Sequence, residues 1–200
     1  MAMSNAMKLV GINSPYDNII YIRNTVDDVA EQDEEVGFLS GNEEKMAVYL
    51  HPFYDTLSTI ARNALSGKAK GQQLEEKVAA KVDEYIAKYH IQAMVALGLR
   101  GRTFDNAVII IDEAQNMSKA TMQKVLSRVG KNCKVIVIGS LRQIDSKYIT
   151  KYTSGLSVLL DSCTRTDLPI KINAVTLHKV VRGPITQFAE LVFAKDFNET

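Results

Sequence analysis

The sequence predicts an α/β fold, a doubly wound and mainly parallel sheet with helices on both faces. Segments typical of strands alternate along the chain with segments whose apolar residues recur at helical spacing. Several strand segments are apolar at every position, as the strands of a parallel sheet are when helices cover both of its faces. The chain has 200 residues, of which 46% are hydrophobic, so we expect one domain over residues 1–200.

Two elements are expected before the first long loop. A short helix should occupy residues 1–10, because apolar residues recur there on one helical face. The segment NIIYIRN at 18–24 is rich in β-branched and aromatic residues and predicts a buried strand. The acidic stretch at 25–44 is expected to be a solvated loop.

Two longer helices should follow. The first is expected from Asn42, whose side chain can cap it and which precedes acidic residues suited to the positive end of the helix dipole. Pro52 should kink or restart this helix. The basic segment SGKAKG at 66–71 should be a flexible link, and the apolar stripe from Leu74 to Tyr89 predicts the second helix.

The second half of the chain contains the most apolar strand segments. Ser118 should cap a helix that runs to about Val129, and a basic loop is expected at 98–106. Gly183 and Pro184 should open a final helix that extends to about Phe193. Strands are predicted at 91–97, 107–112, 134–139 and 171–177, with a short helix at 153–163.

The predicted strand ends carry the candidate site. Ligands bind doubly wound sheets at the carboxyl ends of the strands, and those ends here are Arg23, Asp112 with Glu113, and the loop from Gly139 to Gln143. One carboxylate at a strand end can orient the waters of Mg²⁺ while its neighbour polarises an attacking water, which nucleotide hydrolysis needs. Without further context, the acid pair equally fits a strand end followed by a helix-capping turn.

Two further residues could act with the acid pair. Gln143, after the next strand, could contact a terminal phosphate or the attacking water, and Arg182 could neutralise charge on a transferring phosphoryl group. Each could also be an ordinary solvated side chain.

Composition argues against several classes of protein. The net charge is +1, so no global field favours nucleic acid or an anionic membrane. The two cysteines and three histidines are too far apart in sequence to suggest a zinc site or a disulfide framework, and a cytoplasmic location is expected. No apolar run reaches the roughly 18 residues that cross a bilayer, so we expect no membrane association.

The segment GRTFDNAVIIIDEAQN at 101–116, followed by KVIVIGSLRQID at 134–145, resembles the PhoH family of cytoplasmic ATPases. That family is related to the ATPase core of superfamily 1 helicases. The similarity extends over about residues 1–193 and implies a RecA-like, P-loop NTPase-type sheet. Three other stretches resemble the family as well: NIIYIRNTV, VGFLSGNEEKMAVYLHPFYDTL and VVRGPITQF.

The resemblance implies ATP and Mg²⁺ as cofactors and a role for each candidate residue. Asp112 would organise the magnesium ion, Glu113 would activate water and Gln143 would sense the terminal phosphate. Arg182 resembles an arginine finger or sensor, which in a homo-oligomer could act on a neighbour's nucleotide. RNA or single-stranded DNA is an implied partner, through segments that contain Arg23, Arg100 and Arg102.

The sequence departs from the family pattern in two respects. Ser140 follows Gly139 and Arg142 precedes Gln143, where the family usually has Gly-Asp before Thr-Gln. No Gly-x-x-x-x-Gly-Lys followed by Ser or Thr occurs, and the resemblance places that phosphate loop directly before Met1. We therefore expect a PhoH-like domain without its first strand and phosphate loop, a sheet that is less stable or has a gap at its centre, and weak or no ATP binding.

Three functions stay open from the sequence. The first is a magnesium-dependent ATPase coupled to RNA or DNA remodelling. The second is a binding or scaffold relative that kept the fold and lost hydrolysis. The third, a metal-dependent nuclease using Asp112 and Glu113, would need more clustered acids than these two.

Overall fold

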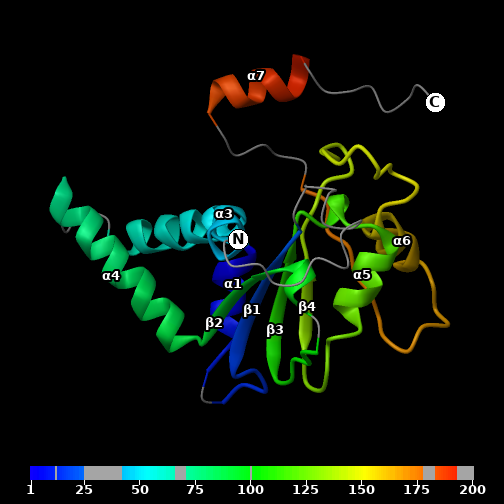
Figure 1. Cartoon of the computed structure of the whole chain (residues 1–200), viewed down its shortest axis with the longest axis horizontal. Helices are drawn as coiled ribbons and strands as arrows, with labels where there is room; N and C mark the ends of the chain where they lie inside the picture. Colours follow the sequence, from blue (N-terminus) through cyan, green and yellow to red (C-terminus); the bar gives the residue numbers. More distant parts are fainter. Residues whose placement is uncertain (12, 25–41, 66–70, 100, 178–182, 193–200) are drawn as a thin grey trace.

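The computed structural model in Figure 1 describes residues 1–11, 13–24, 42–65, 71–99, 101–177 and 183–192. Within these ranges, four strands form one sheet in the order β2-β1-β3-β4, and every neighbouring pair is parallel. The predicted α/β class and the parallel sheet are thereby confirmed. The strands are β1 (Asn18–Arg23), β2 (Ile91–Val95), β3 (Ala107–Asp112) and β4 (Lys134–Val137).

Helices pack on both faces of the sheet, as the doubly wound prediction requires. Side chains alternate along each strand, so β1 and β3 supply apolar residues to two separate cores. Ile19, Tyr21, Val108 and Ile110 face one core, and Ile20, Ile22, Ile109 and Ile111 face the other. The first core includes α1 (Ala2–Leu9), α3 (Asn42–Ala64) and α4 (Gln72–Lys88), and the second includes α5 (Lys119–Leu126) and α6 (Gly155–Ser162).

The prediction of a strand at 171–177 is wrong. These residues belong to no strand, and the side chains of Val175 and Leu177 are 85% and 73% exposed. Their apolar composition suits a strand, but a strand forms only against a hydrogen-bonding neighbour, and in the described ranges β4 ends the sheet. The gap expected at the centre of the sheet is also not observed, because the strands of the described part are continuous hydrogen-bonded neighbours.

Several predicted boundaries shift in the structure. The strand expected at 91–97 ends at Val95 and continues as the 3₁₀ helix η1 (Ala96–Leu99). The helix expected to reach Val129 ends at Leu126, and α3 runs through Pro52 without a break. The buried residues Phe53, Leu57 and Ala61 lie at helical spacing after the proline, so packing on the sheet offsets the lost helical hydrogen bond.

Two serine caps fix the helices that follow β3 and β4. The Ser118 hydroxyl accepts a hydrogen bond from the Thr121 amide at 3.0 Å, which confirms the predicted cap of α5. Ser154 caps α6 in the same way through the Leu156 amide. The final helix α7 (Pro184–Val192) begins where it was predicted. None of the helices in the described ranges combines the length and apolar character that crossing a bilayer requires.

Candidate functional site

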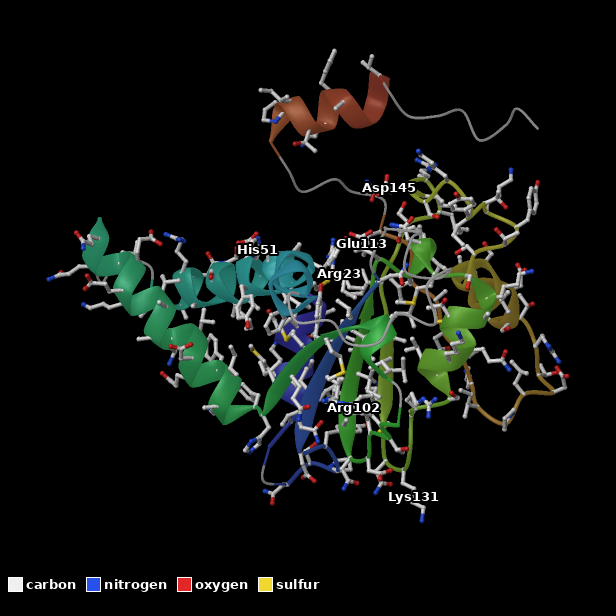
Figure 2. All side chains as sticks on the ribbon, in the orientation of Figure 1. Arg23, His51, Arg102, Glu113, Lys131 and Asp145 are labelled. Carbon is white, nitrogen blue, oxygen red and sulfur yellow. The ribbon has the colours of Figure 1, made fainter. Side chains whose placement is uncertain are left out.

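The pairing of β1 with β3 places a cation beside the acid pair. Arg23 and Asp112 are register partners at the carboxyl ends of the two strands. Nη1 of Arg23 donates to Oδ2 of Asp112 at 2.7 Å, and Nη2 lies 3.4 Å from Oε1 of Glu113. The guanidinium of Arg23 therefore forms ion pairs with both carboxylates. Figure 2 labels Arg23 and Glu113 at this end of the sheet.

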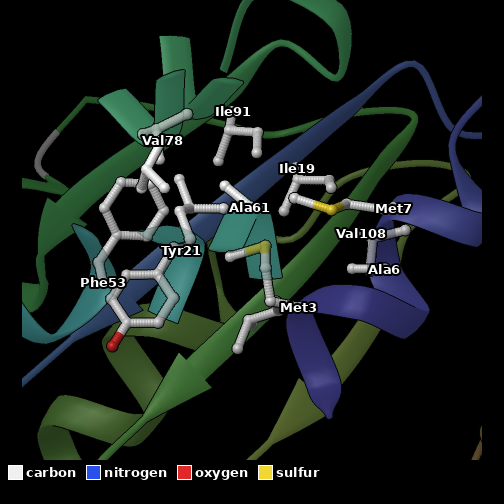
Figure 3. Packing of buried hydrophobic residues seen from close by; sticks show 13 residues of the cluster. Met3, Ala6, Met7, Ile19, Tyr21, Phe53, Ala61, Val78, Ile91 and Val108 are labelled. Atoms are coloured by element: carbon white, nitrogen blue, oxygen red, sulfur yellow. The ribbon is translucent and has the colours of Figure 1, made fainter. Parts of the chain in front are cut away.

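Tyr21 supports Asp112 from inside the core. Its hydroxyl donates to Oδ2 of Asp112, and its ring lies 5.1 Å from the ring of Phe53 in α3. Figure 3 shows the two rings in the buried cluster. Burial first, and then the hydrogen bond to Asp112, raise the pKa of Tyr21 far above its usual value. The hydroxyl therefore stays protonated and remains a donor to the carboxylate over the physiological pH range.

Arg23 keeps its charge in this partly buried place. Burial acts to lower the pKa of Arg23, but the contacts with Tyr21, Asp112 and Glu113 outweigh it and raise the pKa. The side chains of Arg23, Asp112 and Glu113 are 19%, 20% and 33% exposed, so water screens this cluster only in part.

Glu113 turns the chain at the end of β3. Its backbone is left-handed, with φ 53° and ψ 39°, which is unusual for a residue other than glycine. The turn leads into the 3₁₀ helix η2 (Ala114–Asn116), and the amide of Ala114 still pairs with the Ile138 carbonyl at 3.0 Å. Such strained conformations persist where the surroundings hold them, and they are enriched at functional sites.

The buried amide of Gln115 joins the acid pair to the loop after β4. Nε2 of Gln115 donates to Oε2 of Glu113 at 2.6 Å and to the Gln143 carbonyl at 2.9 Å. Oε1 of the same side chain accepts from the Ser140 amide at 3.2 Å. A Cβ on Gly139 would lie 2.7 Å from this oxygen, so a glycine there permits the close approach.

Asn116 makes a second link to the same loop. Its Oδ1 accepts from the amides of Asp145 and Ser146, at 2.9 Å and 3.4 Å, and its carbonyl accepts from Nδ2 of Asn24 at 2.6 Å. Its own Nδ2 is buried and has no acceptor within the described part of the chain. The ends of β1 and β3 and the loop after β4 are thus held by one polar network.

The structure brings together some of the predicted site residues. Asp112, Glu113 and Arg23 are in contact, and Gln143 joins them through its backbone, while its side chain is exposed. Arg102 is exposed and lies toward the other end of the sheet from Arg23 (Figure 2). Arg100 and Arg182 lie outside the described residues, as does most of the loop and link expected at 25–44 and 66–71.

Sequence reasoning missed the roles of Tyr21 and Gln115. Tyr21 precedes Arg23 by two residues, so alternation along β1 places both on the face that meets Asp112. Gln115 follows Glu113 by two residues in the acidic turn. These two spacings were the only indication in the sequence that Tyr21 and Gln115 lie near the acid pair. Their contacts also depend on how segments distant in the sequence pack together.

The donor set suits a hard divalent cation such as Mg²⁺. Carboxylate oxygens are the ligands that Mg²⁺ prefers, and no donor from the described ranges reaches Oδ1 of Asp112. Within those ranges, no three His, Cys, Asp or Glu side chains gather as a metal-binding group. The described residues thus fit an ion that keeps most of its waters or takes phosphate ligands, and they do not form the multi-acid cluster that a nuclease site would need.

Replacement of Gln115 by Glu should lower the free energy of unfolding by about 2–3 kcal/mol, because a buried donor is replaced by a charge beside Glu113. Chemical denaturation followed by circular dichroism measures the loss. Gln123→Glu, the same change at an exposed position of α5, is the control and should have little effect. Equal stability of both variants would contradict the bridging role.

Comparison with known proteins agrees with this architecture. The family model described as "PhoH-like protein" matches residues 1–194. Protein PhoH of Escherichia coli (strain K12) is 39% identical over 135 residues, which cover 67% of this chain and 33% of that protein. The PhoH-like protein of Bacillus subtilis (strain 168) is 34% identical over 167 residues, covering 83% and 46%. The chain thus spans between a third and a half of the length of these relatives. By the extent of the family match, the chain belongs to the PhoH family.

Proposed function

We propose that this chain carries the metal and water positions of a magnesium-dependent ATP-hydrolysing site. The observation that supports the proposal is the convergence of Asp112, Glu113 and the Gln143 loop at the carboxyl end of the inner strand β3, joined by Gln115. This is the end of a parallel sheet at which ligands bind.

Each residue has a distinct role in the proposed reaction. Bound Mg²⁺ would supply positive charge that neutralises the phosphate oxygens of ATP. Asp112 would hold the ion directly or through its waters, and Tyr21 would orient that carboxylate by donating to Oδ2. Glu113 would accept a proton from the attacking water, and the side chain of Gln143 is exposed at the same end, where it could contact the terminal phosphate.

Further parts of the proposal depend on the family relationship. Arg182 would stabilise the charge of the transferring phosphoryl group, within one chain or across a homo-oligomer. Arg23, Arg100 and Arg102 are the candidates for coupling hydrolysis to RNA or single-stranded DNA. Cys133 and Cys163 are both free thiols, which suits the cytoplasm where we place the activity.

The test is an assay of ATP hydrolysis. It uses the longest protein that the gene encodes, including any in-frame sequence before Met1. We expect Mg²⁺-dependent phosphate release that EDTA abolishes and that Asp112→Asn lowers about 100-fold or more, since the cation then loses its carboxylate. Asp145→Asn removes an exposed acid at the same end of the sheet and should leave the rate unchanged. Without Mg²⁺-dependent hydrolysis in this form, the scaffold function would replace the ATPase.

Binding of Mg·ATP to the 200-residue chain alone should be weak or undetectable by calorimetry. These residues contain no Gly-x-x-x-x-Gly-Lys followed by Ser or Thr, the loop whose backbone amides and lysine bind the phosphates. Micromolar affinity for Mg·ATP would contradict this expectation and would require phosphate donors elsewhere in the chain.

A further inference from the structure

Arg23 forms ion pairs with Asp112, the proposed ligand of the cation, and with the adjacent Glu113. Its two terminal nitrogens reach Asp112 at 2.7 Å and Glu113 at 3.4 Å. All three side chains are mostly buried, so their charges interact more strongly than they would at a fully solvated surface. In the metal-free protein, one internal cation thus offsets part of the negative charge that would attract Mg²⁺.

The backbone around Arg23 is held in place on both sides. Arg23 is paired in register with Asp112 on one side and with Val95 on the other. The next residue, Asn24, donates from Nδ2 to the Asn116 carbonyl at 2.6 Å. The strand cannot retreat without breaking these pairs, so only the side chain of Arg23 can leave the acids.

A divalent ion and the guanidinium place like charges next to one carboxylate. Mg²⁺ binds oxygen at about 2.1 Å, a shorter distance than the 2.7 Å between Arg23 and Asp112. Even if the ion used Oδ1, the guanidinium on Oδ2 would lie close enough to repel it. Tyr21 is neutral and can keep its hydrogen bond to Asp112 with either partner.

We propose that Arg23 is a positioning residue that holds the place of the cation, so that Arg23 must release Asp112 and Glu113 when a divalent ion binds. The proposal rests on the proposed function, because it takes Asp112 as the ligand of the ion. It assigns Arg23 a task at the metal position itself, in addition to any contact with nucleic acid.

Binding of Mn²⁺ to the full chain, without nucleotide, tests the proposal. Mn²⁺ prefers the same oxygen ligands as Mg²⁺, and the free ion is measured by electron paramagnetic resonance. Arg23→Gln should bind Mn²⁺ about tenfold more tightly than wild type, equivalent to about 1.4 kcal/mol, because the competing charge is gone. Arg23→Lys keeps the charge and should stay near wild type. Arg165→Gln removes the arginine of an exposed ion pair with Asp167 and should leave the affinity unchanged.

The ligand is identified by Asp112→Asn, alone and combined with Arg23→Gln. We expect this change to remove the Mn²⁺ binding in both backgrounds. If Arg23→Gln binds no more tightly than wild type while Asp112→Asn still abolishes binding, the role of Arg23 is refuted and the metal position stands. If no variant binds Mn²⁺ through Asp112, this carboxylate does not bind a divalent ion in the absence of nucleotide, and the role of Arg23 is refuted.

A measurement on the wild-type chain covers the case in which Arg23→Gln fails to fold. The Nε–H resonance of Arg23 is followed by nuclear magnetic resonance during titration with Mg²⁺. We expect it to move toward the position of a solvated arginine as the guanidinium leaves the acids. An unchanged resonance at saturating Mg²⁺ would refute the proposal.

Discussion

Glu113→Gln is expected to lower the rate of ATP hydrolysis by a factor of about 100 to 10,000, the range typical for loss of a general base. The amide retains the size of the carboxylate and an oxygen that can accept the 2.6 Å hydrogen bond from Gln115. It cannot take a proton from water. The affinity for Mg·ATP should change little, because Asp112 is the proposed ligand of the cation.

The measurement compares phosphate release with nucleotide binding in the longest encoded form of the protein. Glu76→Gln, the same change at an exposed position of α4, is the control and should behave as wild type. Hydrolysis by Glu113→Gln at the wild-type rate would show that another group activates the water. Loss of binding together with hydrolysis would instead assign Glu113 to the cation.

Phe53→Ala should have the largest effect on stability, a loss of about 3–5 kcal/mol in the free energy of unfolding. Phe53 is 1% exposed. It packs in the core that joins α3 to the sheet, where Figure 3 shows its side chain. Its ring is 5.1 Å from that of Tyr21, so the variant also removes a ring that packs against Tyr21, the donor to Asp112. The cavity should therefore loosen the support of Asp112.

Denaturant titration measures this loss, and the adjacent residue provides the control. Tyr54 is 47% exposed, so Tyr54→Ala should cost about 1 kcal/mol or less. A loss below about 1 kcal/mol for Phe53→Ala would contradict the packing of α3 on β1, since deleting a buried phenylalanine costs more than that.

Local patterns in the sequence were sufficient to predict the two inner strands, β1 and β3, and the position of the acid pair. The apolar run before Asp112 and the mixed β-branched and aromatic segment before Arg23 carry strong signals, and both strands lie where they were expected. The ends of parallel strands meet at one edge, so placing Asp112, Glu113 and the Gln143 loop together needed only the fold class.

Contacts between distant segments could not be predicted in the same way. Tyr21 and Asp112 are 91 residues apart, and their hydrogen bond depends on the register of β1 with β3. The bridge by Gln115 depends on a left-handed turn at Glu113 and on the close approach of Gly139. The strand prediction for residues 171–177 was wrong for a related reason. Composition shows that a segment is apolar, but it does not show whether a neighbouring strand is present to pair with it.

The position of β4 at the end of the described sheet bears on how the purified chain will behave. One side of β4 pairs with β3, and no described strand pairs with the other, so within the described ranges β4 is an edge strand. Lys134 is the one charged residue on this strand, followed by Val135, Ile136 and Val137, so little on it discourages intermolecular β-pairing. We therefore expect the isolated chain to aggregate more as its concentration rises, through intermolecular pairing at β4.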